Sequence, residues 1–201
     1  MRKKYQKKDI LEKGISLMCR GGYHHTGITE ILKECSIPKG SFYNFFESKE
    51  QFTLQAVEQY TDSLLTILNS LREDSALNGF EKIESYFAQL AEKHKQDGYK
   101  NSCLLGNLST EVSADNKNLA TIVFRAKNRI KSALAAFVME AQEASLIDKN
   151  FEASALADFI LDAFYGVVAR MKVVQTDEPL RDFFSLHLRF LLTQKKLKFE
   201  Y

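Results

Sequence analysis

Residues 26–49 constrain the fold of this chain more than any other stretch. Apolar side chains recur there at the three- and four-residue spacing of a short amphipathic helix: Ile28, Ile31, Leu32 and Cys35. Thr26 stands where the hydroxyl of an N-cap residue would satisfy a free backbone N–H of the first turn. Because Pro38 disfavours helical backbone at the residue before it, the pattern predicts that this helix ends at Ile37.

A second short helix is predicted directly after Pro38, which itself fits the first turn of a helix. Its apolar side is formed by Phe42, Phe45 and Phe46. Ser48 then fits as the N-cap of a further helix, and Gln51 three residues later completes a capping box. Two short helices joined by a tight turn, here over about residues 27–46, are typical of a helix-turn-helix.

The outer face of the second helix has the chemistry of a DNA reader. Gly40 and Ser41 give it a slim edge that suits a major groove, and Asn44 offers paired hydrogen bonds to a base. Basic and aromatic side chains beside them are placed to reach phosphates. The residues predicted to contact DNA are Thr26, Thr29, Lys39, Gly40, Ser41, Tyr43, Asn44 and Lys49.

Charge is distributed to match this interpretation. Residues 1–50 carry ten lysines and arginines against six acidic residues, whereas the rest of the chain carries 18 against 20. A basic end that also holds a groove-entering helix indicates a polyanion partner, double-stranded DNA. The first eight residues form a basic arm, for which two interpretations stay open: a solubilising tail, or an additional contact to phosphates or the minor groove.

Helical periodicity continues through the rest of the chain, so the sequence predicts an all-α protein. Further helices are expected over about residues 4–20, 49–71, 80–95, 118–145, 152–174 and 180–195. We expect two domains: a three-helix DNA-binding domain over residues 1–48 and a larger helical domain over residues 49–201.

The motif residues resemble the TetR family of bacterial transcriptional regulators. The resemblance rests on the glycines and tyrosine at 21–23, on Thr26, Ile28 and Ile31, and on the run Lys39–Glu50. Ser36 stands where the family usually has a turn glycine, and Phe45 stands where a polar residue or histidine is common. The resemblance implies an N-terminal three-helix DNA-binding domain and a C-terminal helical domain for ligand binding and dimerisation.

The last two predicted helices are more apolar than one buried side requires. Their alanines and glycines permit close approach, so two copies would form a four-helix bundle, which resembles how the family dimerises. His187 is expected to be an interface or core histidine. The predicted interface residues of this homodimer are Phe159, Gly166, Phe183, Phe184, His187 and Leu191.

Residues 102–111 resemble a segment in which some relatives use a cysteine to sense oxidants or electrophiles. If Cys103 starts a helix, the helix dipole would stabilise its thiolate; the alternative is an inert, buried thiol. We expect an apolar pocket for a small-molecule effector in this region. Its predicted residues are Phe87, Leu90, Cys103, Leu104, Asn107, Leu108, Phe124 and Phe164.

These features predict a dimeric repressor that a small apolar or electrophilic ligand releases from a palindromic operator. The alternative is a TetR-like DNA-binding protein that organises chromosomes or the division machinery. An enzyme is not expected, because the chain has no GxSxG, HExxH or phosphate-cradling glycine loop. Cys103 and His94 are the one imaginable dyad, and nothing in the sequence orients the histidine.

No cofactor or metal is expected either. His24 and His25 are adjacent residues that point in different directions and have no partner ligands nearby. The three scattered cysteines suit a reducing cytoplasm. The charged N-terminus lacks the apolar stretch of a signal peptide, and no apolar run approaches the length of a membrane span.

Overall fold

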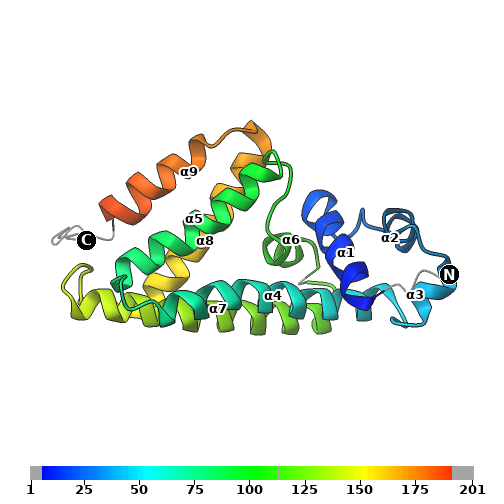
Figure 1. Ribbon diagram of the computed structural model, residues 1–201, viewed down its shortest axis with the longest axis horizontal. Coiled ribbons are helices and arrows are strands. Elements are labelled where there is room, and N and C mark those ends of the chain that lie inside the picture. Colours follow the sequence, from blue (N-terminus) through cyan, green and yellow to red (C-terminus); the bar gives the residue numbers. More distant parts are fainter. Residues whose placement is uncertain (1–5, 113, 192–201) are drawn as a thin grey trace. The chain divides into compact units, whose positions relative to one another are not determined.

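The structure is a computed structural model that describes residues 6–112 and 114–191, and within these ranges every regular element is a helix (Figure 1). The predicted all-α class is therefore confirmed. In chain order the elements are α1 (Lys7–Gly21), α2 (Ile28–Cys35), α3 (Lys39–Tyr43), α4 (Lys49–Glu73), α5 (Gly79–Gln96), α6 (Leu104–Glu111), α7 (Lys117–Glu143), α8 (Ala153–Val174), α9 (Glu178–Asp182) and a π-helix, η1 (Phe183–Leu191).

The chain divides into two compact units. The first comprises the chain up to Ser63 together with Asn101–Lys127, and the second comprises Leu64–Lys100 and the chain from Asn128 onward. Long helices α4 and α7 therefore contribute to both units. This division differs from the predicted boundary at residue 48, because the first turns of α4 belong to the same unit as the helix-turn-helix.

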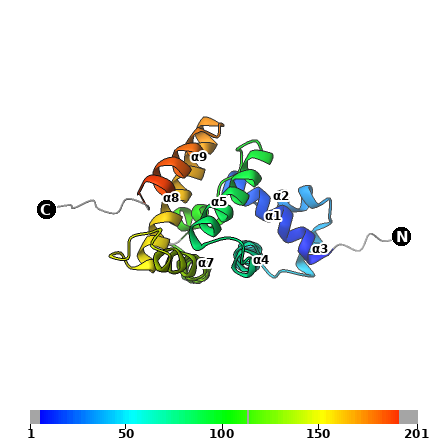
Figure 2. The ribbon, with the colours of Figure 1, turned by 60° about the vertical axis from the view of Figure 1, so that its left-hand side comes forward.

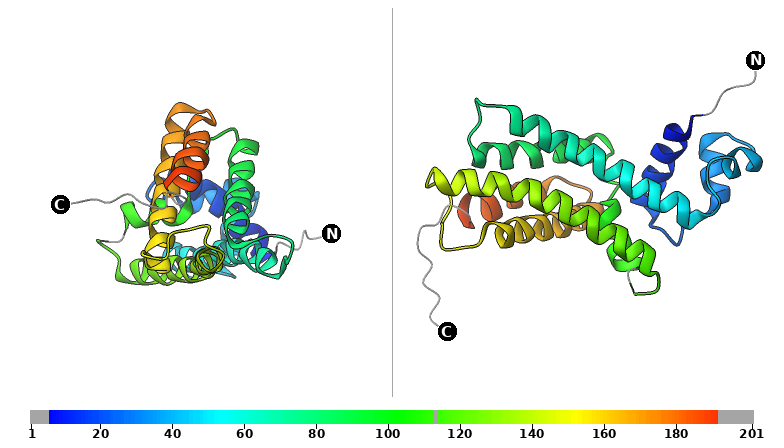
Figure 3. Two further views of the ribbon diagram at one scale, coloured as in Figure 1. Left: turned by 90° about the vertical axis from the view of Figure 1, so that its left-hand side faces the viewer. Right: turned by 90° about the horizontal axis from the view of Figure 1, so that it is seen from below.

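The core of the first unit is built around Phe52, whose side chain is fully buried on α4. Its ring lies 5.6 Å from that of Phe42 and 4.9 Å from that of Phe46. On α1, a Cβ added to Gly14 would stand only 2.2 Å from the Phe52 ring. Glycine at this position thus lets α1 cross the start of α4 at close range (Figure 3).

Side chains next to and on α6 cap the end of α1. The backbone N–H and the hydroxyl of Ser102 both donate to the Cys19 carbonyl, at 3.0 and 2.9 Å. The Asn107 amide donates to the Met18 carbonyl at 2.9 Å. Because the last carbonyls of a helix have no partner within it, these bonds satisfy groups that burial would otherwise penalise.

In the second unit, α5, α8 and η1 pack around three buried aromatic rings. Phe87 lies 4.8 Å from Phe164 and 5.0 Å from Phe183, measured between ring centroids. Asn78 and Glu81 form a capping box that starts α5. Figure 2 shows α9 and η1 lying beside α8.

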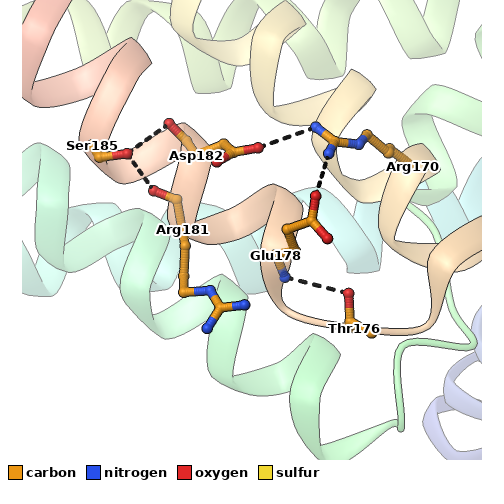
Figure 4. Close-up of polar contacts among 6 residues, drawn as sticks. All are labelled: Arg170, Thr176, Glu178, Arg181, Asp182 and Ser185. Atoms are coloured by element: carbon orange, nitrogen blue, oxygen red, sulfur yellow. Dashed lines mark hydrogen bonds and ion pairs between the residues drawn. The ribbon is translucent and has the colours of Figure 1, made fainter.

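The predicted single helix over residues 180–195 is instead α9 followed by the π-helix η1, and residues 192–195 lie outside the described ranges. Apolar spacing of three and four residues does not separate a π-helix from an α-helix, so no local pattern predicted this change. At the corner between α8 and α9, the Arg170 guanidinium pairs with Glu178 at 2.9 Å and with Asp182 at 3.3 Å (Figure 4).

Among the described helices, none combines the length and the apolar character that crossing a bilayer would require.

Candidate DNA-binding interface

The turn between α2 and α3 is closed by backbone hydrogen bonds around Ser36. Its N–H donates to the Lys33 carbonyl at 3.1 Å, and the Ile37 N–H donates to the Leu32 carbonyl at 3.0 Å. This pair of bonds is the Schellman motif, which requires left-handed backbone at the residue after the helix. Ser36 adopts that conformation, with φ 53°. A serine therefore performs the role for which the family usually has glycine, at a conformational cost.

Helix α3 buries one side and presents the other to solvent. Phe42 and Phe46 are buried against Phe52, whereas Lys39, Gly40, Tyr43 and Asn44 are exposed. A Cβ added to Gly40 would have no atom within 4 Å, so the edge of the helix is slim and open. Thr29 on α2 is also exposed, and Ser41 is half-buried. This arrangement leaves the amide of Asn44 and the ammonium of Lys39 available to a ligand outside the unit.

Thr26 is placed differently from the prediction. Its side chain is only 2% exposed, and its hydroxyl donates to the Gly22 carbonyl at 2.7 Å. The N-cap of α2 is Gly27, whose backbone N–H donates to the Glu30 carboxylate at 2.8 Å. The predicted N-cap role of Thr26 is therefore wrong, because its hydroxyl ties the α1–α2 loop instead of the first turn of α2.

Lys49 does not extend freely to solvent. Its ammonium donates to the Tyr23 carbonyl at 2.6 Å and lies 4.0 Å from the centre of the Tyr23 ring. Burial lowers the pKa of this lysine. The side chain therefore joins the start of α4 to the α1–α2 loop, and a phosphate would have to compete with Tyr23 for it.

The start of α4 has the predicted cap. The Gln51 N–H donates to the Ser48 hydroxyl at 3.1 Å, as expected for a capping box. In a capping box the Gln51 side chain would also accept from the Ser48 backbone N–H. Here it accepts instead from the backbone N–H of the preceding residue, Glu47, at 2.7 Å.

Comparison with known proteins agrees with this geometry. The family model described as bacterial regulatory proteins, tetR family, matches residues 10–56, and the model of a tetracyclin repressor-like C-terminal domain matches residues 79–186. The chain belongs to the TetR family. It is therefore a DNA-binding regulator of transcription, and residues 10–56 include the helix-turn-helix described above.

Individual TetR-family proteins are similar over nearly the whole chain. The HTH-type transcriptional repressor DhaR of Mycobacterium sp. (strain GP1) is 31% identical over 91% of this chain and 90% of its own length. The crystal structure of a regulatory protein TetR from Rhodobacter sphaeroides superposes with a TM-score of 0.86 at 25% identity, covering 91% of this chain and 97% of that one. Reduced E. coli NemR shares the fold, with a TM-score of 0.79 at 23% identity over 95% and 99% of the two chains.

The residues predicted to line an effector pocket fall into different environments. Phe87, Leu90 and Phe164 are buried in the second unit, whereas the α6 residues Leu104 and Leu108 are buried in the first.

Two of the predicted pocket residues are placed differently. Phe124 is 67% exposed, because it lies off the buried stripe of α7, and its assignment to a pocket is corrected. The amide of Asn107 already bonds the end of α1, so this side chain positions α6 in the first unit.

Cys103 is the N-cap residue of α6, as its sequence position suggested. Its side chain is buried, and its sulfur lies 3.6 Å from the Tyr60 hydroxyl. Burial raises the pKa of the thiol, and this effect outweighs the hydrogen bonds from Gly106 and Tyr60 that favour the thiolate. Physically, Cys103 resembles a core thiol more than an activated nucleophile.

The residues predicted at a dimer interface also divide by burial. Phe159 is 43% exposed on α8, and a Cβ added to the exposed Gly166 would meet no atom within 4 Å. Phe184 and His187 are half-buried, and the His187 ring stacks on Phe183. Phe183 itself is fully buried between Phe87 and Phe164, so its assignment to the interface is corrected.

Leu191 was also predicted at this interface. It ends η1, but its side chain lies outside the described structure.

Sequence reasoning missed the contacts that hold the α1–α2 loop. The Glu111 carboxylate accepts from the His24 N–H at 3.0 Å, and the Glu111 carbonyl lies 3.1 Å from the His24 ring nitrogen. The two residues are 87 positions apart, so no local pattern marks the pair. Within the described part of the chain, no cluster of side chains has the composition of a metal site.

Proposed function

We propose that this protein is a homodimeric repressor that binds a palindromic operator and is released by a small apolar effector. The observation that carries the proposal is helix α3 with its C-cap residue Asn44. The exposed Lys39, Gly40, Tyr43 and Asn44 stand on a buried aromatic base. A rigid base matters because base-reading groups must be held in register with the groove. Relatives named as transcriptional repressors support repression rather than activation.

The exposed face of α8 supports the dimer. Phe159, Gly166 and Val173 follow one another at seven-residue intervals and are all exposed, Val173 to 83%. An apolar stripe with a glycine at its centre suits close packing against the same helix of a second copy. Two reading heads in such a dimer would contact half-sites about 34–36 Å apart, one turn of DNA.

The effector is proposed to bind without a covalent bond. The buried thiol of Cys103, with its raised pKa, does not favour the thiolate that an electrophile would attack. Coupling of about 1–3 kcal/mol between effector and operator would lower operator affinity about 5- to 150-fold.

DNA recognition is tested by salt-titrated binding of the purified protein to its own upstream DNA and to a random duplex. Asn44→Ala should lose about 1–3 kcal/mol at one base pair and leave binding to random DNA unchanged. Lys39→Ala should weaken both complexes and reduce the slope of log K against log salt by about one. Asn69→Ala, at an exposed asparagine of α4 in the second unit, is the matched control.

An equal loss on specific and random DNA for Asn44→Ala would refute its base-reading role. Treatment with a thiol-reactive quinone tests the effector. Specific binding should survive this treatment. Binding that is lost in the wild type but retained by Cys103→Ser would instead make the protein an electrophile sensor.

A further inference from the structure

A groove of about 940 Å³ opens on the first unit, and three helices form its walls. The start of α1 contributes Lys7 and Leu11, α4 contributes Leu54 and Glu58, and the start of α7 contributes Ile122 and Arg125. Its volume is within the range of about 300–1,000 Å³ that small-molecule sites occupy. None of these residues was predicted to bind an effector, and the groove involves neither the exposed face of α3 nor the aromatic cluster of the second unit.

The floor of the groove is apolar. Leu11 is 6% exposed, and Leu54 and Ile122 are half-buried, so each leaves part of its side chain open to the groove. An apolar body that covers this floor would remove apolar surface from water, which is the main favourable contribution to such association.

The rim of the groove is positively charged. Lys7, Lys8 and Arg125 line it, against the single carboxylate of Glu58. The Lys8 ammonium pairs with the Glu12 carboxylate at 3.8 Å, but both side chains are exposed, so this pair is weak and can exchange for another anion. Asn118 in the first turn of α7 also lines the groove, and that turn carries no acidic residue, whereas the first turn of α1 carries Asp9.

We propose that this groove binds a small amphipathic organic anion, with its acidic group at the cationic rim and its apolar body on the leucine and isoleucine floor. A phosphodiester matches this surface less well, because it has charge but no apolar body to cover the floor. This proposal does not depend on the proposed operator or effector, because the groove is defined by its lining residues alone.

The absence of tryptophan from the chain allows a direct test on the full-length protein. Thr121 is exposed and lines the groove, so Thr121→Trp places a single fluorescent reporter there. Decanoate, kept below its micelle-forming concentration, is the probe, and decanol is the neutral molecule of equal chain length. Gln89→Trp, at an exposed position of α5 in the second unit, is the matched reporter control.

We expect decanoate to produce a saturable change in the indole fluorescence of the Thr121→Trp protein, no change in the Gln89→Trp protein, and weaker binding of decanol. Removing each rim charge should weaken the binding of decanoate about two- to fivefold, which is the range expected for an exposed ion pair. The double variant Lys7→Gln with Arg125→Gln, made in the Thr121→Trp protein, should therefore bind decanoate roughly tenfold more weakly. Arg129→Gln, on the same helix but outside the lining, should retain full affinity.

Three results would overturn the proposal. One is equal affinity for decanol and decanoate, and another is equal affinity of the double variant and Arg129→Gln. The third is a double variant whose salt slope on random duplex falls by about two, which would assign both cations to phosphates. Circular dichroism and thermal melting of each variant separate loss of binding from loss of folding.

Discussion

Replacing Gly22 by alanine should destabilise the first unit, because the added Cβ both strains the backbone and displaces the Glu111 carboxylate. Gly22 has φ 84° and ψ 173°, a region of backbone space that is essentially restricted to glycine. A Cβ there would also stand 2.2 and 2.9 Å from the two carboxylate oxygens of Glu111. Because the carboxylate is the flexible end of a side chain, it would rotate away and abandon its 3.0 Å bond to the His24 N–H.

The magnitude follows from these effects. The backbone strain costs about 1–3 kcal/mol. Loss of a hydrogen bond to a charged group costs about 1.5–3 kcal/mol. The lower conformational entropy of alanine in the unfolded chain returns about 0.4–1 kcal/mol. We therefore expect Gly22→Ala to lower the free energy of unfolding by about 1.5–5.5 kcal/mol.

Equilibrium unfolding in guanidinium chloride, with m-values compared, measures the effect. Gly21→Ala is the control, because this neighbour is helical and its added Cβ would meet no atom nearer than the His25 Cβ at 4.0 Å. It should be neutral or slightly stabilising. If the carboxylate is displaced, Glu111→Ala should add little in the Gly22→Ala background. Additivity of the two changes within about 0.5 kcal/mol would refute the reasoning.

Three further predictions concern other contacts. Ser36→Gly should stabilise the protein by about 0.5–1 kcal/mol in thermal or chemical unfolding, because it relieves left-handed strain at a small entropic cost; a loss of stability would contradict this expectation. Glu140→Ala should destabilise it by about 1–3 kcal/mol in the same assays, because the Lys82 ammonium, 3.0 Å away with its side chain 7% exposed, loses its partner; an unchanged unfolding curve would contradict this. Hydrogen bonds from Asn118, and then Asn116, lower the pKa of Glu50 below its ordinary value, so its stabilising contribution is complete above the unfolded-state pKa and is lost as the pH falls through the folded-state pKa. Asn118→Ala should raise that pKa in an NMR titration, and an unchanged titration would show that the bond has no effect in solution.

Local signals in the sequence accounted for most of the elements. Proline and capping residues separate consecutive helices, and the apolar stripe of the predicted 118–145 helix returns as buried Ala126, Ile130 and Phe137 on α7. The same periodicity excludes Phe124 from that stripe, since it is two residues away from Ile122 and so points to a different side of the helix. Its assignment to a pocket therefore conflicted with a signal that the sequence already contains.

Contacts between distant segments could not be predicted in this way. Spacing placed Lys49 at the start of a helix, but not its ammonium on the carbonyl and ring of Tyr23. Thr26 likewise has the composition of an N-cap, and only the folded loop shows that its hydroxyl bonds Gly22. These side chains have several partners within reach, and the choice depends on how helices pack.

The position of Phe52 has a consequence for engineering chimeric regulators. The ring that supports α3 and contacts Gly14 belongs to α4, and the carbonyls that end α1 are capped by Ser102 and Asn107. A DNA-binding domain transplanted as residues 1–48 alone would lack Phe52, the ring at the centre of its core, and the residues that cap α1. A graft that also carries the start of α4 and α6 transfers this core together with the helix-turn-helix. The transferable DNA-binding unit of this protein is therefore discontinuous in sequence.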